Sequence, residues 1–276
     1  MHTPLEAEAV ALLRSLCHDR GVILHAACCV DSREAFQDLC RRHGVSPEEK
    51  LSTGGHVVLL GDSILDNASY VSPGYSVREQ LEGVLPPGWQ VTLLAVDGAR
   101  MADVKRQLSR LPSDATHLVL SVGGNDVLAQ SWNILSTPAT RVSQALEHLG
   151  SVRSDFATEY LDVLYRLRAA SLPLTVCTIY DAVPELGLAE KTGLAVFNDA
   201  ISRHAASVGA SLIDLRAICN DPRDYSDVSP IEPSEAGGRK ISRAIEVAVR
   251  VPEGFVVGLA SLQSTGRLPA SSTSQE

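Results

Sequence analysis

Short apolar runs alternate with helical patterns over most of the chain, and this alternation constrains the fold more than any other feature. Five runs predict β-strands: His56–Leu60, Gln90–Ala95, His117–Ser121, Leu174–Thr178 and Ser211–Asp214. Apolar residues at helical spacing predict helices near Ser76–Val84, Met101–Arg110, Thr140–Ala170, Leu188–Val208 and Ser234–Val249. Apolar strands separated by helices indicate a parallel sheet covered on both faces. Right-handed crossovers then make a doubly wound α/β fold the expected architecture.

The alternation of apolar runs and helical patterns covers only the middle of the chain, so we divide the chain into three segments. Residues 1–54 have two amphipathic patterns and are expected to form an N-terminal helical extension. Residues 55–255 carry the α/β pattern and are expected to form the main domain. Residues 256–276 are rich in Ser and Thr, which predicts a flexible C-terminal tail.

Charge and hydropathy exclude several classes of function. The 276 residues carry a net charge of −9, so a nucleic-acid partner is not expected, because phosphate binding needs clustered Lys and Arg. No apolar run approaches the roughly 20 residues of a membrane span. Glu6 and Glu8 stand where a secretory signal would be basic, so a cytoplasmic location is expected. The composition does not address the oligomeric state.

Cysteine and histidine residues gather near the N-terminus, where a zinc site has to be considered. The residues concerned are Cys17, His18, His25, Cys28, Cys29, Cys40 and His43. Their spacings match no common zinc pattern and include no CxxC pair. We therefore expect no metal site here, and none among the acidic residues near the strand ends.

Three of the predicted strands end in residues suited to acyl chemistry. Ser63 follows the first strand and is either an exposed nucleophile or the N-cap of a helix. Gly98 follows the second and either serves a tight turn or offers its N–H to an anion. Asn125 follows the third and either caps a turn or donates to an oxyanion. Because carboxyl ends of parallel strands share one edge, convergence of the three groups would give the layout for acyl transfer.

These blocks resemble those of the GDSL (SGNH) hydrolase family. The similar stretches are Gly61-Asp62-Ser63-Ile64, the glycine of Asp97-Gly98-Ala99, and Gly123-Gly124-Asn125-Asp126. The resemblance covers roughly residues 55–250 and implies a flavodoxin-like, five-stranded parallel sheet. It also implies hydrolysis of carboxylic esters without a cofactor. By this resemblance Ser63 is the nucleophile, and its N–H, the N–H of Gly98 and the Asn125 side chain form the oxyanion hole.

The chain departs from the family pattern at the catalytic base. The family carries an Asp, two residues and then a His before the C-terminal helix, whereas the corresponding positions here are Ser229 and Glu232. No histidine follows His204. Glu232 is thus either a replacement base, with a pKa raised by burial, or a carboxylate that stabilises the helix N-terminus or contacts a ligand.

Four further residues are candidates for contact with a substrate. Asp62 and Asp126 belong to the family-like blocks, where such residues more often brace turns by hydrogen bonds. Trp132 lies in a segment between Val127 and Thr140 that we interpret as a loop, and it either covers an acyl pocket or packs that loop. Tyr180 follows the fourth strand and is expected to face the same edge.

The sequence therefore predicts an acyl-ester hydrolase that acts on a small-molecule ester through Ser63, with Gly98 and Asn125 as oxyanion donors and Glu232 in place of the usual base. The missing His favours an alternative, in which the fold persists as a non-catalytic binding or scaffold protein. A third possibility is an acyltransferase. The acyl chain and the alcohol are not specified by these patterns.

Overall fold

The computed structural model describes residues 54–250, Gly254 and Val256–Val257. The predicted N-terminal extension, its Cys and His residues and most of the predicted tail lie outside these residues.

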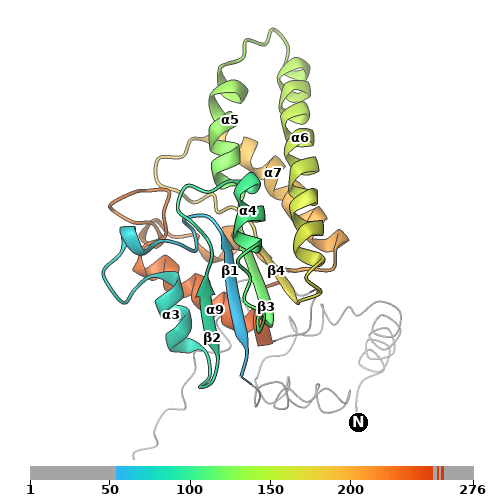
Figure 1. The fold of residues 1–276 in the computed structure, drawn as a ribbon. Helices are drawn as coiled ribbons and strands as arrows, with labels where there is room; N and C mark the ends of the chain where they lie inside the picture. The colour runs from blue at the N-terminus through green and yellow to red at the C-terminus, as the bar shows by residue number, and fades with distance from the viewer. Residues whose placement is uncertain (1–53, 251–253, 255, 258–276) are drawn as a thin grey trace, which may run out of the picture.

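The centre of the molecule is one parallel sheet (Figure 1). Its strands are β1 (His56–Gly61), β2 (Gln90–Leu93), β3 (His117–Ser121), β4 (Leu174–Cys177), β5 (Ser211–Ile213) and β6 (Val256–Val257). They lie in the order β2-β1-β3-β4-β5-β6, and every neighbouring pair is parallel. The doubly wound, flavodoxin-like fold is confirmed, with the five predicted strands present. The short β6 adds a sixth strand from the first two residues of the predicted tail.

The predicted helices also form, with small shifts at their ends. They are α3 (Val77–Val84), α4 (Met101–Leu108), α6 (Val142–Arg168), α7 (Leu188–Ser207) and α9 (Glu235–Arg250). Shorter helical turns are η2 (Ala68–Tyr70), α8 (Leu215–Ile218) and η3 (Pro222–Asp224).

Each face of the sheet has its own hydrophobic core, because side chains alternate along a strand. In β1, Val58 and Leu60 face a core shared with α4, α6 and α7. Val57 and Leu59 face the opposite core, shared with α3 and α9. All four side chains are fully buried. Burial on both faces explains why the strands are continuous apolar runs.

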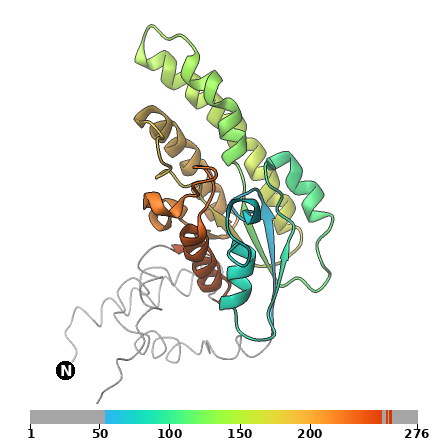
Figure 2. The ribbon, with the colours of Figure 1, turned by 90° about the vertical axis from the view of Figure 1, so that its left-hand side faces the viewer.

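One prediction about the region after β3 was wrong. The segment from Val127 to Thr140, interpreted as a loop, is mostly helix α5 (Gly124–Ser136). Its N-cap Gly123 has φ +116°, a left-handed conformation that turns the chain directly from strand into helix. None of its side chains is buried, so the apolar stripe that marks a core helix is weak. With α6 it forms an antiparallel arm that projects beyond the sheet (Figures 1 and 2).

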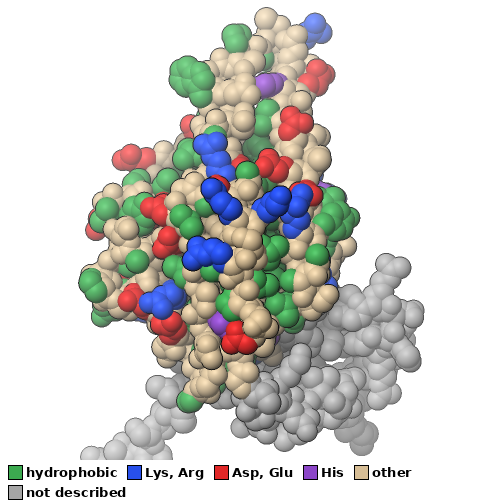
Figure 3. Space-filling model, viewed as in Figure 1, with side chains coloured by type: hydrophobic (Ala, Val, Ile, Leu, Met, Phe, Trp, Pro, Cys, Tyr) green, Lys and Arg blue, Asp and Glu red, His purple; other side chains and the backbone are tan. Residues whose placement is uncertain are grey.

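The surface over α4 and the adjoining part of α6 carries basic and acidic side chains close together (Figure 3). Arg106 pairs with Asp103, and Arg166 pairs with Asp162. Exposed pairs of this kind contribute little to stability. Within the described residues, no helix combines the length and apolarity needed to cross a bilayer.

Candidate active site

The turn after β1 presents Ser63 at the carboxyl edge of the sheet, and it depends on Gly61. Gly61 has φ +121°, and a Cβ there would lie 1.7 Å from the carbonyl oxygen of Ser121. The buried Gln107 side chain accepts from the Gly61 N–H and donates to its carbonyl, both at 2.7 Å. Asp62 N–H donates to the same Ser121 carbonyl at 3.0 Å. The chain therefore leaves β1 along a braced path to Ser63.

The hydroxyl of Ser63 contacts the carboxylate predicted to stand in the position of the base. Ser63 Oγ donates to Glu232 Oε1 at 2.9 Å, across 169 residues of sequence. Ser63 and Glu232 are 7% and 4% exposed. The separation falls within the ~2.6–3.2 Å at which a carboxylate can take a hydroxyl proton.

A network of backbone bonds holds Glu232 in place just before α9. Its N–H donates to the Ser229 carbonyl at 3.0 Å, and its own carbonyl accepts from Ser226 N–H at 2.9 Å. The Tyr180 hydroxyl donates to the carbonyl of Ile231. Ser229, which the resemblance aligns with an orienting Asp, thus contributes its backbone carbonyl, and Tyr180 holds the residue before Glu232.

Burial shifts two neighbouring carboxyl groups toward neutrality. The pKa of Glu232 is raised to about 7, chiefly by desolvation, while its bond from Ser63 acts in the opposite direction and the charge of Asp97 adds a further increase. The pKa of Asp62 is raised to about 8 by its complete burial, opposed by the Ile64 N–H and increased by the charges of Glu232 and Asp126. Within the described residues, Glu232 Oε2 is buried without a hydrogen-bond partner.

Potential oxyanion donors lie on the neighbouring turns. Asn125, in the first turn of α5, donates one amide hydrogen to the Ala99 carbonyl at 3.0 Å. An amide carries two hydrogens, so the second is left for a ligand. Gly98 has φ +76° and is exposed, with open space where a Cβ would be. In the described part of the chain, no hydrogen bond uses the backbone N–H of Ser63 or Gly98.

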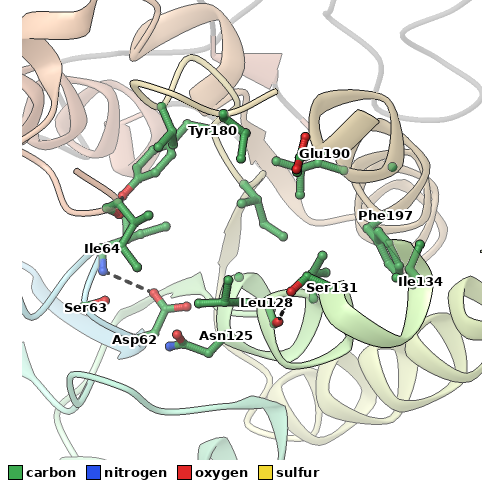
Figure 4. A pocket seen from close by; sticks show the side chains of 18 of the residues that line it. Asp62, Ser63, Ile64, Asn125, Leu128, Ser131, Ile134, Tyr180, Glu190 and Phe197 are labelled. Atoms are coloured by element: carbon green, nitrogen blue, oxygen red, sulfur yellow. Dashed lines mark hydrogen bonds between the residues drawn. The ribbon is translucent and has the colours of Figure 1, made fainter. Parts of the chain in front are cut away.

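The structure brings some of the predicted substrate contacts together and leaves others outside. Asp62 and Asn125 lie side by side at one end of a cavity, near Ser63 (Figure 4), and Tyr180 also lines it. Asp126 instead accepts from Met101 N–H at 3.1 Å and so braces the start of α4. Trp132 is 81% exposed and does not line this cavity.

The cavity beside Ser63 has a volume of about 280 Å³ and a largely apolar wall. Residues of α5, the segment after β4 and α7 supply most of that wall; they include Val127, Leu128, Ile134, Ile179, Leu194 and Phe197. The described residues include no group of three His, Cys, Asp or Glu side chains that could hold a metal ion.

Comparison with known proteins assigns the chain to a family. Residues 59–240 match the model of the GDSL-like lipase/acylhydrolase family. The chain belongs to this family. Ester hydrolysis is therefore the general activity that its membership indicates. No curated protein sequence matches this GDSL-like chain.

Solved structures share the GDSL-like fold at low sequence identity. An extracellular lipase from Streptomyces rimosus is 18% identical, with a TM-score of 0.51 over 72% of this chain and 100% of the lipase. A lipolytic G-D-S-L protein from Veillonella parvula is 16% identical, with a TM-score of 0.53 over 72% of this chain and 100% of that one. The acetylxylan esterase Axe2 from Geobacillus stearothermophilus is 16% identical, with a TM-score of 0.52 over 74% and 97%.

Sequence reasoning missed several residues that shape this GDSL-like site. Gln107 carries no motif, since one glutamine on a helix is indistinguishable from a surface residue. The cavity-lining residues of α7 lie in a segment whose pattern predicts a helix but indicates no cavity. The residues of α5 that face the cavity carried a usable signal, because Val127, Ser131 and Ile134 recur at helical spacing.

Proposed function

We propose that the protein hydrolyses small carboxylic esters with Ser63 as nucleophile and Glu232 as general base. The observation that carries the proposal is the 2.9 Å hydrogen bond from Ser63 Oγ to Glu232 Oε1 in a buried setting. A serine hydroxyl is a weak nucleophile until a base takes its proton. A carboxylate with a pKa of about 7 is a far stronger base than an exposed glutamate.

The reaction proceeds in two balanced halves. Ser63 Oγ bonds to the ester carbonyl carbon as its proton passes to Glu232, and the negative charge moves to the carbonyl oxygen. Asn125 and the N–H groups of Ser63 and Gly98 are the proposed donors to that oxyanion. The carbon–oxygen bond to the alcohol then breaks, and Glu232 protonates the leaving oxygen. Water then attacks the acyl-Ser63 ester as Glu232 takes its proton. The bond to Ser63 Oγ breaks, Glu232 returns the proton to Ser63, and the carboxylic acid is released.

Turnover of p-nitrophenyl acetate by variants tests this proposal. We expect Ser63→Ala to lower kcat by at least about 10³-fold, because the covalent route is lost. Glu232→Gln should lower it by about 10²–10⁴-fold, because general-base catalysis typically contributes that much. Glu82→Gln, which removes an exposed carboxylate on α3, should retain wild-type turnover. Equal rates for wild type and Ser63→Ala would refute the proposal.

A non-catalytic binding protein is the second candidate. It is favoured by the buried Glu232 Oε2, which has no partner among the described residues, so no third group orients the base. A fluorophosphonate separates the two, because it labels only an activated serine. Labelling of wild type but not of Glu232→Gln supports the hydrolase, whereas a wild type that binds esters without labelling or turnover supports the binding protein. Transfer of the acyl group to an added alcohol in preference to water would identify an acyltransferase.

A further inference from the structure

The cavity beside Ser63 has one polar end and one apolar end. Asp62, Ser63 and Asn125 lie at the polar end (Figure 4), and α5 and α7 line the rest. Glu232 also lines the polar end, beside Ser63. Its volume of about 280 Å³ is at the lower limit of the roughly 300–1,000 Å³ of small-molecule sites. The space therefore suits one flexible chain rather than a whole lipid.

Two polar side chains, Ser131 and Glu190, line the apolar part. Ser131 Oγ donates to the carbonyl of Leu128 in its own helix at 2.7 Å. Glu190, in the first turn of α7, lies against Gly187, the N-cap residue of that helix. A sugar or other polyol would lose its water hydrogen bonds here with few replacements, which is costly. An aliphatic chain instead gains about 0.8 kcal/mol for each buried methylene.

The two steps of the proposed reaction decide whether the aliphatic chain in the cavity belongs to the acyl side or the alcohol side of the ester. The acyl group stays bonded to Ser63 between the steps, whereas the alcohol has to leave and water has to enter. On the other side of the nucleophile, the turn after β2 is open to solvent, since Val96 is 49% exposed and Gly98 is also exposed. The apolar cavity between α5 and α7 thus fits the group that stays, and the exposed turn after β2 fits the group that leaves.

One residue in the cavity wall leaves room that a side chain would fill. Gly193 lies in α7 on the face that also carries Glu190 and Phe197, three and four residues away, and all three line the cavity. A Cβ on Gly193 would meet nothing within 4 Å. The absence of a side chain at this position therefore extends the apolar part of the cavity.

We infer that the cavity holds the straight aliphatic acyl chain of the ester, and that Gly193 sets the acyl length the enzyme accepts. This inference rests on the proposed function and adds the substrate class. The preferred substrates are medium-chain acyl esters of small alcohols, and the wall of α5 and α7 selects them over acetyl esters.

Turnover of p-nitrophenyl acetate, butyrate, hexanoate and octanoate tests the inference. For the wild type we expect kcat/KM to rise by up to about fourfold per methylene until the cavity is filled. Gly193→Phe should lower the ratio of octanoate to acetate kcat/KM by more than tenfold, and Gly193→Leu should have an intermediate effect. Gly150→Phe is the matched control, because Gly150 is also a helical glycine with nothing within 4 Å but does not line the cavity. Its ratio should equal that of the wild type.

Acetate esters of different alcohols test the opposite assignment, in which the cavity holds the alcohol. If turnover of ethyl, butyl and octyl acetates responds to Gly193→Phe and the acyl series does not, the cavity holds the alcohol and the inference is wrong. A flat acyl series in the wild type also overturns it.

Binding separates this inference from the proposed function. Calorimetric titration of the Ser63→Ala variant with octanamide, an uncharged probe that needs no turnover, should detect binding. The added Gly193→Phe change should weaken that binding by more than tenfold. Equal binding by both variants overturns the cavity assignment, whatever the ester assays give. If the wild type hydrolyses no ester but octanamide binding still depends on Gly193, only the proposed hydrolase function is wrong.

Discussion

A carboxylate base changes the charge balance of a serine hydrolase at the level of single residues. A histidine base becomes a cation when it takes the serine proton, and an orienting Asp stabilises that cation. Glu232 would become a neutral acid instead, so its negative charge would pass to the oxyanion. An ionised orienting Asp would only repel that charge, and the neighbouring Asp62 has its own pKa raised to about 8. In the proposed mechanism, no orienting Asp is therefore needed at Ser229, the residue that the sequence resemblance aligns with it.

The same pair predicts a pH dependence with a definite sign. The active form needs Glu232 ionised, and its pKa is raised to about 7. We therefore expect kcat/KM for ester hydrolysis to rise about tenfold per pH unit below pH 7 and to level off above it. Initial rates from pH 5 to 9 check this when they are followed at the isosbestic wavelength of p-nitrophenol. A profile that is flat across pH 7 would contradict Glu232 as the base.

At the scale of elements, the nucleophile turn depends on α4 as much as on β1. The Gln107 side chain satisfies both backbone groups of Gly61, and it is 4% exposed. A buried polar group without a partner costs about 1–3 kcal/mol. The contact links a helix to a turn 46 residues earlier, so the position of Ser63 relies on tertiary structure.

Replacement of Gln107 by leucine tests this brace. Gln107→Leu should lower the free energy of unfolding by about 1–3 kcal/mol, because the Gly61 N–H loses its partner, whereas the Gly61 carbonyl keeps the bond that it accepts from Val96 N–H at 3.0 Å. Urea denaturation measures the change. Gln130→Leu, on the exposed face of α5, is the matched control and should stay within about 0.5 kcal/mol of the wild type. Equal free energies of unfolding for the two variants would show that the contact of Gln107 with Gly61 does not stabilise the fold.

Across the whole molecule, a doubly covered sheet supports an arm that has little core of its own. In β3, the side chains from Leu118 to Leu120 are fully buried, whereas α5 has no buried side chain. The cavity lies between this arm and α7, so part of the candidate site is built on the less buried part of the fold. Regions with few buried contacts open locally at low free-energy cost.

Amide hydrogen exchange should follow this division. We expect the slowest exchange in β1 and β3, and exchange in α5 that is faster by at least about tenfold, because local opening of α5 exposes little apolar surface. The part of α6 that carries Phe156 and Leu164 is an internal control, since these side chains pack in the core. Protection of α5 equal to that of β3 would contradict this view of the arm.

Sequence patterns are sufficient to predict the layers of the fold and the turns at the strand ends. Continuous apolar runs mark β1 and β3 as strands buried on both faces, and helical periodicity marks the buried face of the long α6. Gly61 and Gly98 were also readable, because backbone that needs positive φ favours glycine. Helix α5 escaped this reasoning, since it buries no side chain and so leaves little pattern to detect.

The resemblance to the family points to Glu232 as a candidate base, but the fold is what brings its carboxylate to Ser63. Its contact with Glu232 spans 169 residues, and the support of Glu232 by Tyr180 joins two further loops. Local sequence patterns give no information about such contacts, because strand order and helix packing set the distance between the two contacting side chains. The pKa of Glu232 follows the same rule. Its shift arises from burial among groups that the fold assembles, and no neighbour in the sequence determines it.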